Sequence, residues 1–402
     1  MGVLAQHGFG CGTKVEDALE KGYIDGCIYS PKDIQQSKLK DKIESLPKTA
    51  KVYFDPQYYA TIVAQEPNAK LGNLVSDYAG YFSEKNFREL RREKNVAMEV
   101  EKTILFQKEE LNLRNIIVPN ILVQDGLNSA SSNIAKTFLE IGSEIASGMN
   151  VNRNALLTLA LDQSCFRNTQ ELLDLADEIT GLGLETKGFY ILVETSKEDG
   201  VNPWFIPEVL AGQMYLAYAL AQNGYRVVYG YSFLPSPYLW AAGAKDVASG
   251  WFNTQRYFSL NKFRDIGASG RKANRRYFSD CLWLPVEWTQ VQSFRSVVDL
   301  MNGFGTDELY LHPSDEKRPN ETDEVLQYWE TLKKKEMELH SLRNTVTKVE
   351  YLLDCIEKQN VVLTQFKRIG RLPFGDEILR NCQRSLYLFA ELAELSLSVK
   401  NA

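Results

Sequence analysis

The fold is decided by the stretch ALLTLALDQSCFRNTQELLDLADEITGLGLETKGFYILVE, residues 155–194. Its two ends, 155–161 and 188–193, are apolar at both alternating positions, which is typical of strands covered on both faces. Between them, apolar residues recur with a helical period from Thr169 to Ile179. The stretch therefore predicts a strand, a helix and a second strand, the repeating unit of a parallel sheet with helical crossovers.

The same alternation recurs through the first three-quarters of the chain. Eight runs read as strands: GCIYS (26–30), KVYF (51–54), NILVQ (120–124), ALLTLAL (155–161), GFYILV (188–193), RVVYGY (226–231), DVASG (246–250) and CLWLP (281–285). Eight strands with helical crossovers predict an α/β fold, a (β/α)8 TIM-type barrel. An open doubly wound sheet is the alternative, but no G-x-G-x-x-G or G-x-x-x-x-G-K-[ST] follows the first run, which weighs against its dinucleotide-binding and P-loop versions.

Amphipathic helices are expected between these runs. The apolar period and the capping residues predict helices over 84–112, 128–145, 169–179, 207–222, 238–242 and 289–302. The helix over 207–222 has the clearest limits, because Pro207 suits a helix start and Asn223-Gly224 suits a helix end.

The character of the chain changes after about residue 320. Charges dominate, and apolar residues from Val325 to Ile356 alternate spacings of three and four, a coiled-coil-like heptad seam with one break near Lys335. A second helix is expected over 376–399, joined by a turn at 370–375. We therefore divide the chain into a barrel (1–305) and a helical C-terminal extension (306–402). The extension either packs on its own barrel or forms an oligomerisation arm.

Composition narrows the class of protein. The chain has 402 residues, 44% of them hydrophobic, with neither a signal-peptide pattern nor a long apolar span, so a cytoplasmic protein without membrane association is expected. The six cysteines are scattered without a C-x-x-C pair, and there are three histidines, so no zinc motif is present. A net charge of −6 argues against a surface that coats nucleic acid generally.

Carboxylates follow four consecutive predicted strands. They are Asp55, Asp125, Asp162 and Glu194. In a closed barrel these side chains converge on one side of the mouth, where mutual repulsion separates their pKa values, as an acid/base pair or a nucleophile at a glycosidic carbon requires. Two other uses of the same residues stay open: binding of a hard cation such as Mg²⁺ or Mn²⁺, and capping of the next turn. No other cofactor is predicted.

A basic, aromatic stretch follows the seventh run. Residues 252–280 carry seven cations against two acids: Arg256, Lys262, Arg264, Arg271, Lys272, Arg275 and Arg276. In an acidic protein this reversal of sign favours contact with a phosphate, and barrels often bind phosphate in loops after the seventh and eighth strands. A nucleotide, a sugar phosphate or a nucleic-acid backbone would suit the stretch. The alternative is a solvated loop that pairs with acidic surface elsewhere.

Further polar and aromatic residues at the strand ends are candidates for the pocket wall. They are Ser30, Lys32, Gln57, Gln163, Tyr231 and Trp251. His7 precedes the first predicted strand, so we expect it near the bottom of the barrel in a structural role.

These features together favour an enzyme of nucleotide-type substrates, a hydrolase or glycosyltransferase. Asp162 and Asp125 are the candidate nucleophile or general base, and Glu194 is the candidate acid. The phosphate clamp is assigned to Arg271, Lys272, Arg275 and Arg276. The alternatives are a metal-dependent phosphoester hydrolase and an inactive barrel that binds nucleic acid or a protein partner.

Overall fold

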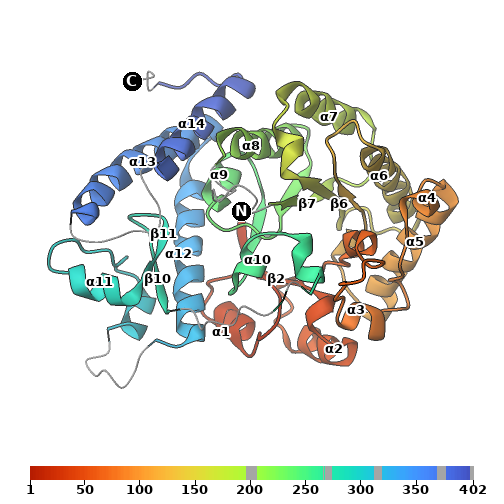
Figure 1. The fold of residues 1–402 in the computed structure, drawn as a ribbon, viewed down its shortest axis with the longest axis horizontal. Coiled ribbons are helices and arrows are strands. Elements are labelled where there is room, and N and C mark those ends of the chain that lie inside the picture. The colour runs from red at the N-terminus through yellow and green to blue at the C-terminus, as the bar shows by residue number, and fades with distance from the viewer. Residues whose placement is uncertain (196–205, 266, 268–273, 312–318, 369–376, 399–402) are drawn as a thin grey trace.

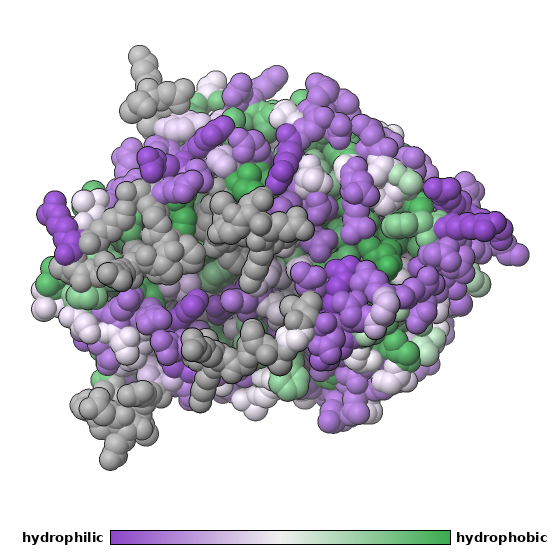
Figure 2. Space-filling model, in the orientation of Figure 1, coloured by the Kyte–Doolittle hydropathy of each residue, from purple (hydrophilic) through white to green (hydrophobic). Residues whose placement is uncertain are grey.

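A computed structural model describes residues 1–195, 206–265, 267, 274–311, 319–368 and 377–398 (Figure 1). Parallel strands lie at the centre of one half of the molecule, and helices surround them. The C-terminal helices and a small antiparallel hairpin form the other side. The face drawn in Figure 2 is mainly hydrophilic, with smaller apolar areas between charged side chains.

The strands of the described residues form a nearly closed parallel barrel, which confirms the predicted (β/α)8 class. In chain order they are β1 (Gly2–Gln6), β2 (Gly26–Tyr29), β3 (Lys51–Phe54), β4 (Ile116–Val118) with its continuation β5 (Leu122–Val123), β6 (Ala155–Asp162), β7 (Gly188–Glu194), β8 (Arg226–Tyr229) and β9 (Asp246–Ser249). Hydrogen-bonded neighbours follow the order β3-β2-β1-β9-β8-β7-β6-β4, and β5 also pairs with β6. Between β3 and β4 the seam is bridged by Asn115 Nδ2, which donates to Val52 O at 3.2 Å.

Two strand predictions are wrong. The first barrel strand is β1, which the sequence analysis passed over because one residue precedes it and no turn signal marks its start. The run 281–285 is not in the barrel: it ends in β11 (Leu284–Glu287), which pairs antiparallel with β10 (Arg276–Ser279). Pro285 argues against a central barrel strand, because the backbone nitrogen of proline donates no hydrogen bond and proline is rare in the middle of a sheet.

Some barrel helices lie close to their predicted ranges, such as those expected over 169–179 and 207–222. They are α1 (Lys14–Glu20), α2 (Gln36–Ser45), α5 (Glu93–Leu105), α6 (Ala130–Gly148), α7 (Thr169–Gly181), α8 (Pro207–Gln222) and α9 (Ser236–Ala241). The α8 limits confirm the prediction for 207–222. The expected long helix over 84–112 is divided into α4 (Phe87–Leu90), α5 and a π-helical turn, η3 (Phe106–Glu110). The expected helix over 289–302 ends early, as α11 (Trp288–Phe294).

Helix α12 (Glu321–Ser341) covers the junction of the first and last barrel strands. It packs against β1, α1 and α9. Trp329 Nε1 donates to Ser249 O at 3.0 Å and Tyr328 OH bonds Ser249 Oγ at 2.7 Å, which fixes α12 to the end of β9. Residues 250–320 are therefore inserted between β9 and the helix that covers it, and they carry β10, β11, α11 and two single-turn segments before η7 (Gly305–Leu309).

The last two helices pack on one another and on the barrel. The interruption of the heptad pattern expected near Lys335 does not break the helix there; α12 ends at Ser341 and α13 (Thr345–Lys367) begins after Asn344 caps it. Helix α14 (Glu377–Leu392) lies on α8, where the Phe389 and Tyr218 rings are 5.9 Å apart. The expected turn at 370–375 lies outside the described residues. Oligomerisation through these helices stays a prediction, as does the division of the chain at residue 305.

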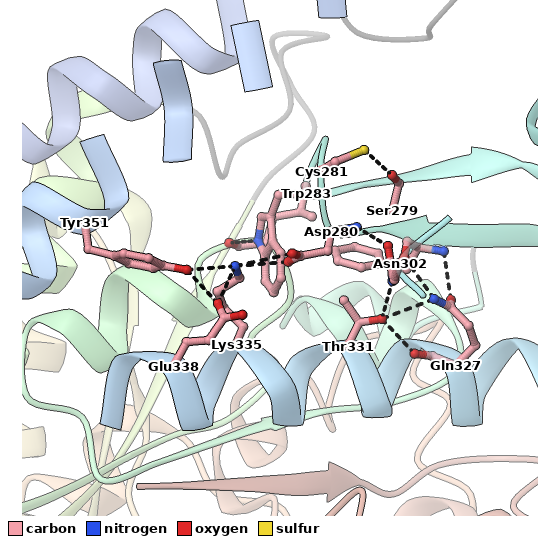
Figure 3. Close-up of polar contacts among 12 residues, drawn as sticks. Ser279, Asp280, Cys281, Trp283, Asn302, Gln327, Thr331, Lys335, Glu338 and Tyr351 are labelled. Carbon is pink, nitrogen blue, oxygen red and sulfur yellow. Dashed lines mark hydrogen bonds and ion pairs between the residues drawn. The ribbon is translucent and has the colours of Figure 1, made fainter. Parts of the chain in front are cut away.

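A buried lysine joins the hairpin, α12 and α13 (Figure 3). Lys335 Nζ lies 3.1 Å from Asp280 Oδ1 and 2.7 Å from Glu338 Oε2, and it donates to Tyr351 OH at 3.3 Å. The two carboxylates outweigh desolvation and raise the pKa of Lys335. One ammonium group therefore neutralises acids from two separate elements.

Amide side chains complete the attachment of the hairpin (Figure 3). Gln327 accepts from Phe278 N and donates to Phe278 O, both at 2.9 Å, and so substitutes for a neighbouring strand at β10. Asn302 donates to Phe278 O at 3.0 Å and to Thr331 Oγ1 at 2.9 Å. The hairpin is thus fixed to α12 by polar side chains as well as by apolar packing.

In the described part of the chain, no helix has both the length and the apolar character that crossing a bilayer requires.

We predict that Lys335→Met lowers the free energy of unfolding by about 2–4 kcal/mol, because Asp280 and Glu338 keep their charges in partly buried surroundings without a cation. Lys358→Met is the matched control. Lys358 pairs with Asp354 at 2.6 Å, but its side chain is 74% exposed and the pair is screened by water, so its loss should leave the free energy of unfolding close to that of the wild type. Urea denaturation followed by tryptophan fluorescence measures both; equal costs would contradict this account.

Candidate active site at the barrel mouth

Parallel strands bring their carboxyl ends to one mouth, and several predicted site residues meet there. Asp55 follows β3, Asp162 ends β6 and Glu194 ends β7. Tyr231 and Trp251 follow β8 and β9, and both are buried. The predicted positions at strand ends therefore share one end of the barrel, but their surroundings differ.

Asp55 is the most enclosed of the acids. Its side chain is buried, and Oδ2 accepts from Tyr59 OH at 2.7 Å and from Tyr190 OH at 3.2 Å. Oδ1 accepts from the backbone N–H of Gln57 at 3.0 Å. Burial raises the pKa of Asp55 in spite of these hydrogen bonds and of the positive charge of Lys262. Asp55 is therefore a fixed, desolvated carboxyl group at the centre of the mouth.

Two mouth residues adopt a backbone conformation that side chains other than glycine rarely take. Gln57 has φ +53° and Tyr231 has φ +51°. They contact one another, since Gln57 Nε2 donates to Tyr231 OH at 3.5 Å, while Gln57 Oε1 accepts from Lys32 N at 3.1 Å. Ser30 is buried on the neighbouring strand end. Local strain of this kind is concentrated at functional sites, where it holds side chains in place.

Residues 252–265, here called the strap, cross part of the mouth. Thr195 N donates to Phe258 O at 3.0 Å, and Leu260 N donates to Glu194 Oε1 at 2.8 Å. On the other side, Arg264 forms a two-pronged ion pair with Glu66, with N–O distances of 2.6 and 2.7 Å. The strap is thus attached to both sides of the barrel mouth.

The strap directs Lys262 toward the central network. Its ammonium group donates to Tyr231 OH and lies 4.3 Å from the centre of the Tyr231 ring and 5.0 Å from that of Phe263. Burial lowers the pKa of Lys262 to about 8, although the charge of Asp55 acts in the opposite direction. Sequence reasoning noted Lys262 as part of a basic stretch but did not assign it to the site.

Asp162 and Glu194 form a pair on the rim. They are register partners at the ends of β6 and β7. Asp162 Oδ1 accepts from Ser164 N at 2.8 Å, which fixes that carboxylate as a cap of the next turn. Burial raises the pKa of Glu194, and the charge of Asp162 raises it further. Gln163, next in the chain, is buried.

Asp125 is exposed to solvent, whereas Asp162 and Glu194 are partly buried. It follows β5 with φ +61°, and its side chain faces solvent. The next helix, α6, is capped by Ser129, whose side chain accepts from Ser132 N, so the capping use left open for Asp125 stays a prediction.

Of the four cations assigned to the phosphate clamp, the two described ones, Arg275 and Arg276, lie at the start of the hairpin, and Arg256, a separate binding candidate, lies beside the end of β9. Arg256 is buried against the rings of Phe233 and Tyr328, at 4.9 and 4.6 Å, and donates to Gly250 O. Arg275 pairs with Glu324 on α12 at 3.4 Å, and Arg276 begins β10. Arg271 and Lys272 lie outside the described residues. The strap instead brings Lys262 and Arg264 to the mouth.

The prediction for His7 is wrong in position. Because β1 is a barrel strand, His7 follows its carboxyl end and lies at the mouth, not at the bottom. It is buried between Tyr29 and Trp251, with ring centres 5.1 and 6.0 Å away. Burial, together with the charges of two lysines, lowers the pKa of His7 to about 3. The imidazole is therefore neutral at physiological pH.

Among the described residues, no group of three or more His, Cys, Asp or Glu side chains is placed to hold a metal ion.

We predict that His7 weakens the protein in mild acid. In the unfolded chain its pKa returns to about 6.5, so between pH 6.5 and 3 the unfolded state binds a proton that the folded state does not, and stability falls with falling pH. Between pH 7 and 5 the wild type should therefore lose about 2 kcal/mol more than His7→Gln. Urea titrations at both pH values measure the difference. His340→Gln, at an exposed position of α12, is the control and should behave as the wild type.

Comparison with known proteins supplies no family for this chain. No protein-family model, curated protein or solved structure matches it. The proposals below therefore depend on the arrangement of the mouth itself.

Proposed function

We propose that this protein is an enzyme whose active site is the barrel mouth, and that it transfers or hydrolyses the glycosidic bond of a nucleotide or nucleoside. The observation that carries the proposal is the rim pair, Asp162 and Glu194, on adjacent parallel strands. Two carboxyl groups side by side, one of them with a raised pKa, are the arrangement that glycosidic bond cleavage uses.

The two carboxyl groups have different surroundings and suit different roles. Glu194, with its pKa raised by burial, suits the general acid that protonates the departing base. Asp162 is oriented by Ser164 N and suits the nucleophile or the general base at the anomeric carbon. Asp125 follows β5, the strand that precedes β6 in the chain, and its side chain is exposed. It is the alternative candidate for the nucleophile or the general base.

Phosphate recognition is the second part of the proposal. Lys32 and Arg264 are cations at the mouth, and Arg264 is close enough to Glu194 to influence its charge. Arg271 and Lys272, which lie outside the described residues, stay part of the proposed clamp. A substrate of nucleotide size would bind at the rim beside the strap, because the small cavity beneath Phe258 and Tyr231, about 20 Å³, has room for roughly one water molecule.

Further expectations belong to the same proposal. A cytoplasmic location is supported by six free cysteines, as reducing compartments maintain them. The C-terminal helices α12, α13 and α14, within residues 306–402 of the proposed division, offer surfaces for a second copy or a protein partner. An inactive barrel that only binds its ligand is the competing function, and the following experiment separates the two.

We predict that Asp162→Asn and Glu194→Gln each lower kcat by about 10²–10⁴-fold while changing ligand affinity less than tenfold. Both substitutions keep the oxygen that accepts from Ser164 N or Leu260 N, so the fold should persist. Nucleosides and nucleotides are first screened for thermal stabilisation, and release of free base is then followed by chromatography. Asp174→Asn, at an exposed position of α7, is the matched control and should retain full activity. A ligand that binds equally to all variants without turnover would favour the binding-only function.

A further inference from the structure

Lys262 occupies an unusual place for a lysine. It belongs to the strap, and its side chain is partly buried between the rings of Tyr231 and Phe263. Within the described ranges its ammonium group forms no ion pair with a carboxylate; its hydrogen bond goes to a tyrosine hydroxyl. Two other lysines of the barrel differ in this respect, since Lys32 lies 3.8 Å from Asp33 and Lys51, at the opposite end of the barrel, lies 2.7 Å from Asp246.

We propose that Lys262 is a nucleophilic amine, which forms a reversible imine with the aldehyde or ketone group of a small carbonyl compound at the barrel mouth. This goes beyond the proposed glycosyl chemistry, because the carboxylate pair on the rim needs no amine. The supporting geometry is the enclosure of the amine by two aromatic rings and its hydrogen bond to the hydroxyl group of Tyr231.

The surroundings favour the uncharged amine, which is the reactive form. Burial lowers the pKa of Lys262 to about 8, so roughly a quarter of it is neutral at pH 7.5, against about 0.1% of an ordinary exposed lysine. The groups that act on its charge come from three strand ends and the turn after β2: Asp55, Asp33, Lys32, Tyr231 and His7. The two carboxylates favour the charged form, but desolvation outweighs them.

The reaction balances without any redox partner. The nitrogen lone pair of Lys262 forms a bond to the carbonyl carbon while the C=O π pair moves to the oxygen, and one N–H proton passes to that oxygen to give a neutral carbinolamine. The hydroxyl group then takes up one proton from solvent and leaves as water while the nitrogen lone pair forms the second C–N bond, which yields a protonated imine. Tyr231 OH accepts from the nitrogen and positions it, and the negative charge of Asp55 stabilises the cationic imine. Hydrolysis reverses every step.

The test uses the full-length protein, glycolaldehyde as the carbonyl probe and sodium cyanoborohydride to reduce the imine to a stable amine. Peptide mass spectrometry then gives the rate of labelling at each lysine. At pH 7.5 Lys262 should be labelled at least tenfold faster than Lys70, whose side chain is 64% exposed, and the rate at Lys262 should rise with a midpoint near pH 8. Labelling of Lys262 no faster than that of Lys70 would overturn the proposal.

Two variants sharpen the result. Lys262→Arg keeps a positive charge beside Tyr231 but cannot form an imine, so the fast label should disappear while the slow labelling of Lys70 is unchanged. Tyr231→Phe should slow labelling of Lys262 severalfold by removing the hydroxyl. If fast labelling survived Lys262→Arg, another amine would be responsible and the proposal would be wrong. Because labelling is read without any nucleoside, its outcome is independent of the proposed glycosyl reaction.

Discussion

The pairing of β1 with both β2 and β9 is the interaction on which the rest of the structure depends. Leu4 and Ala5 are in register with residues of both neighbours, so the five residues of β1 connect the first and last parts of the sheet. The opposite end of the barrel from the mouth is held by charge. Asp246 of β9 is fully buried and binds Lys51 of β3 and Arg226 of β8, each at 2.7 Å. A nearly closed parallel barrel then follows, and with it a single mouth.

Side chains at the mouth are buried, and two residues there have positive φ angles. Both features follow from closure of the barrel. Side chains at the ends of β1, β3 and β8 are forced into the centre, where water is excluded, so acids and bases there lose solvation. The tyrosines around Asp55 replace part of this lost solvation with hydrogen bonds. The insertion after β9 adds a cation from outside the barrel, Lys262, and the attachment of the strap at Glu66 and Glu194 holds it over Tyr231. Titratable groups are thus enclosed at one end of the molecule.

Much of the fold could be predicted from local pattern, because parallel strands and amphipathic helices have distinct periods. The α8 limits and the positions of Asp55, Asp162 and Glu194 at strand ends followed from it. The errors arose where the local sequence pattern does not distinguish a barrel strand from other structure. GVLAQ at 2–6 has no preceding helix or turn to mark it, and the hairpin run 281–285 is as apolar as a barrel strand. The position of Lys262 at the mouth could not be predicted from the sequence, since it depends on contacts between distant segments, such as Lys70 N with Phe263 O.

Native-state hydrogen exchange of the β1 amides tests the central claim most directly. If β1 is held on both sides inside the barrel, the amides of residues 3–6 that bond to β2 and β9 exchange only through global unfolding, as slowly as those of β6 and β7 in the centre of the sheet. Exchange of these amides through local opening, with a free energy several kcal/mol below that of the β6 and β7 amides, would mean that β1 is not held between β2 and β9 and that the strand ends do not form one mouth.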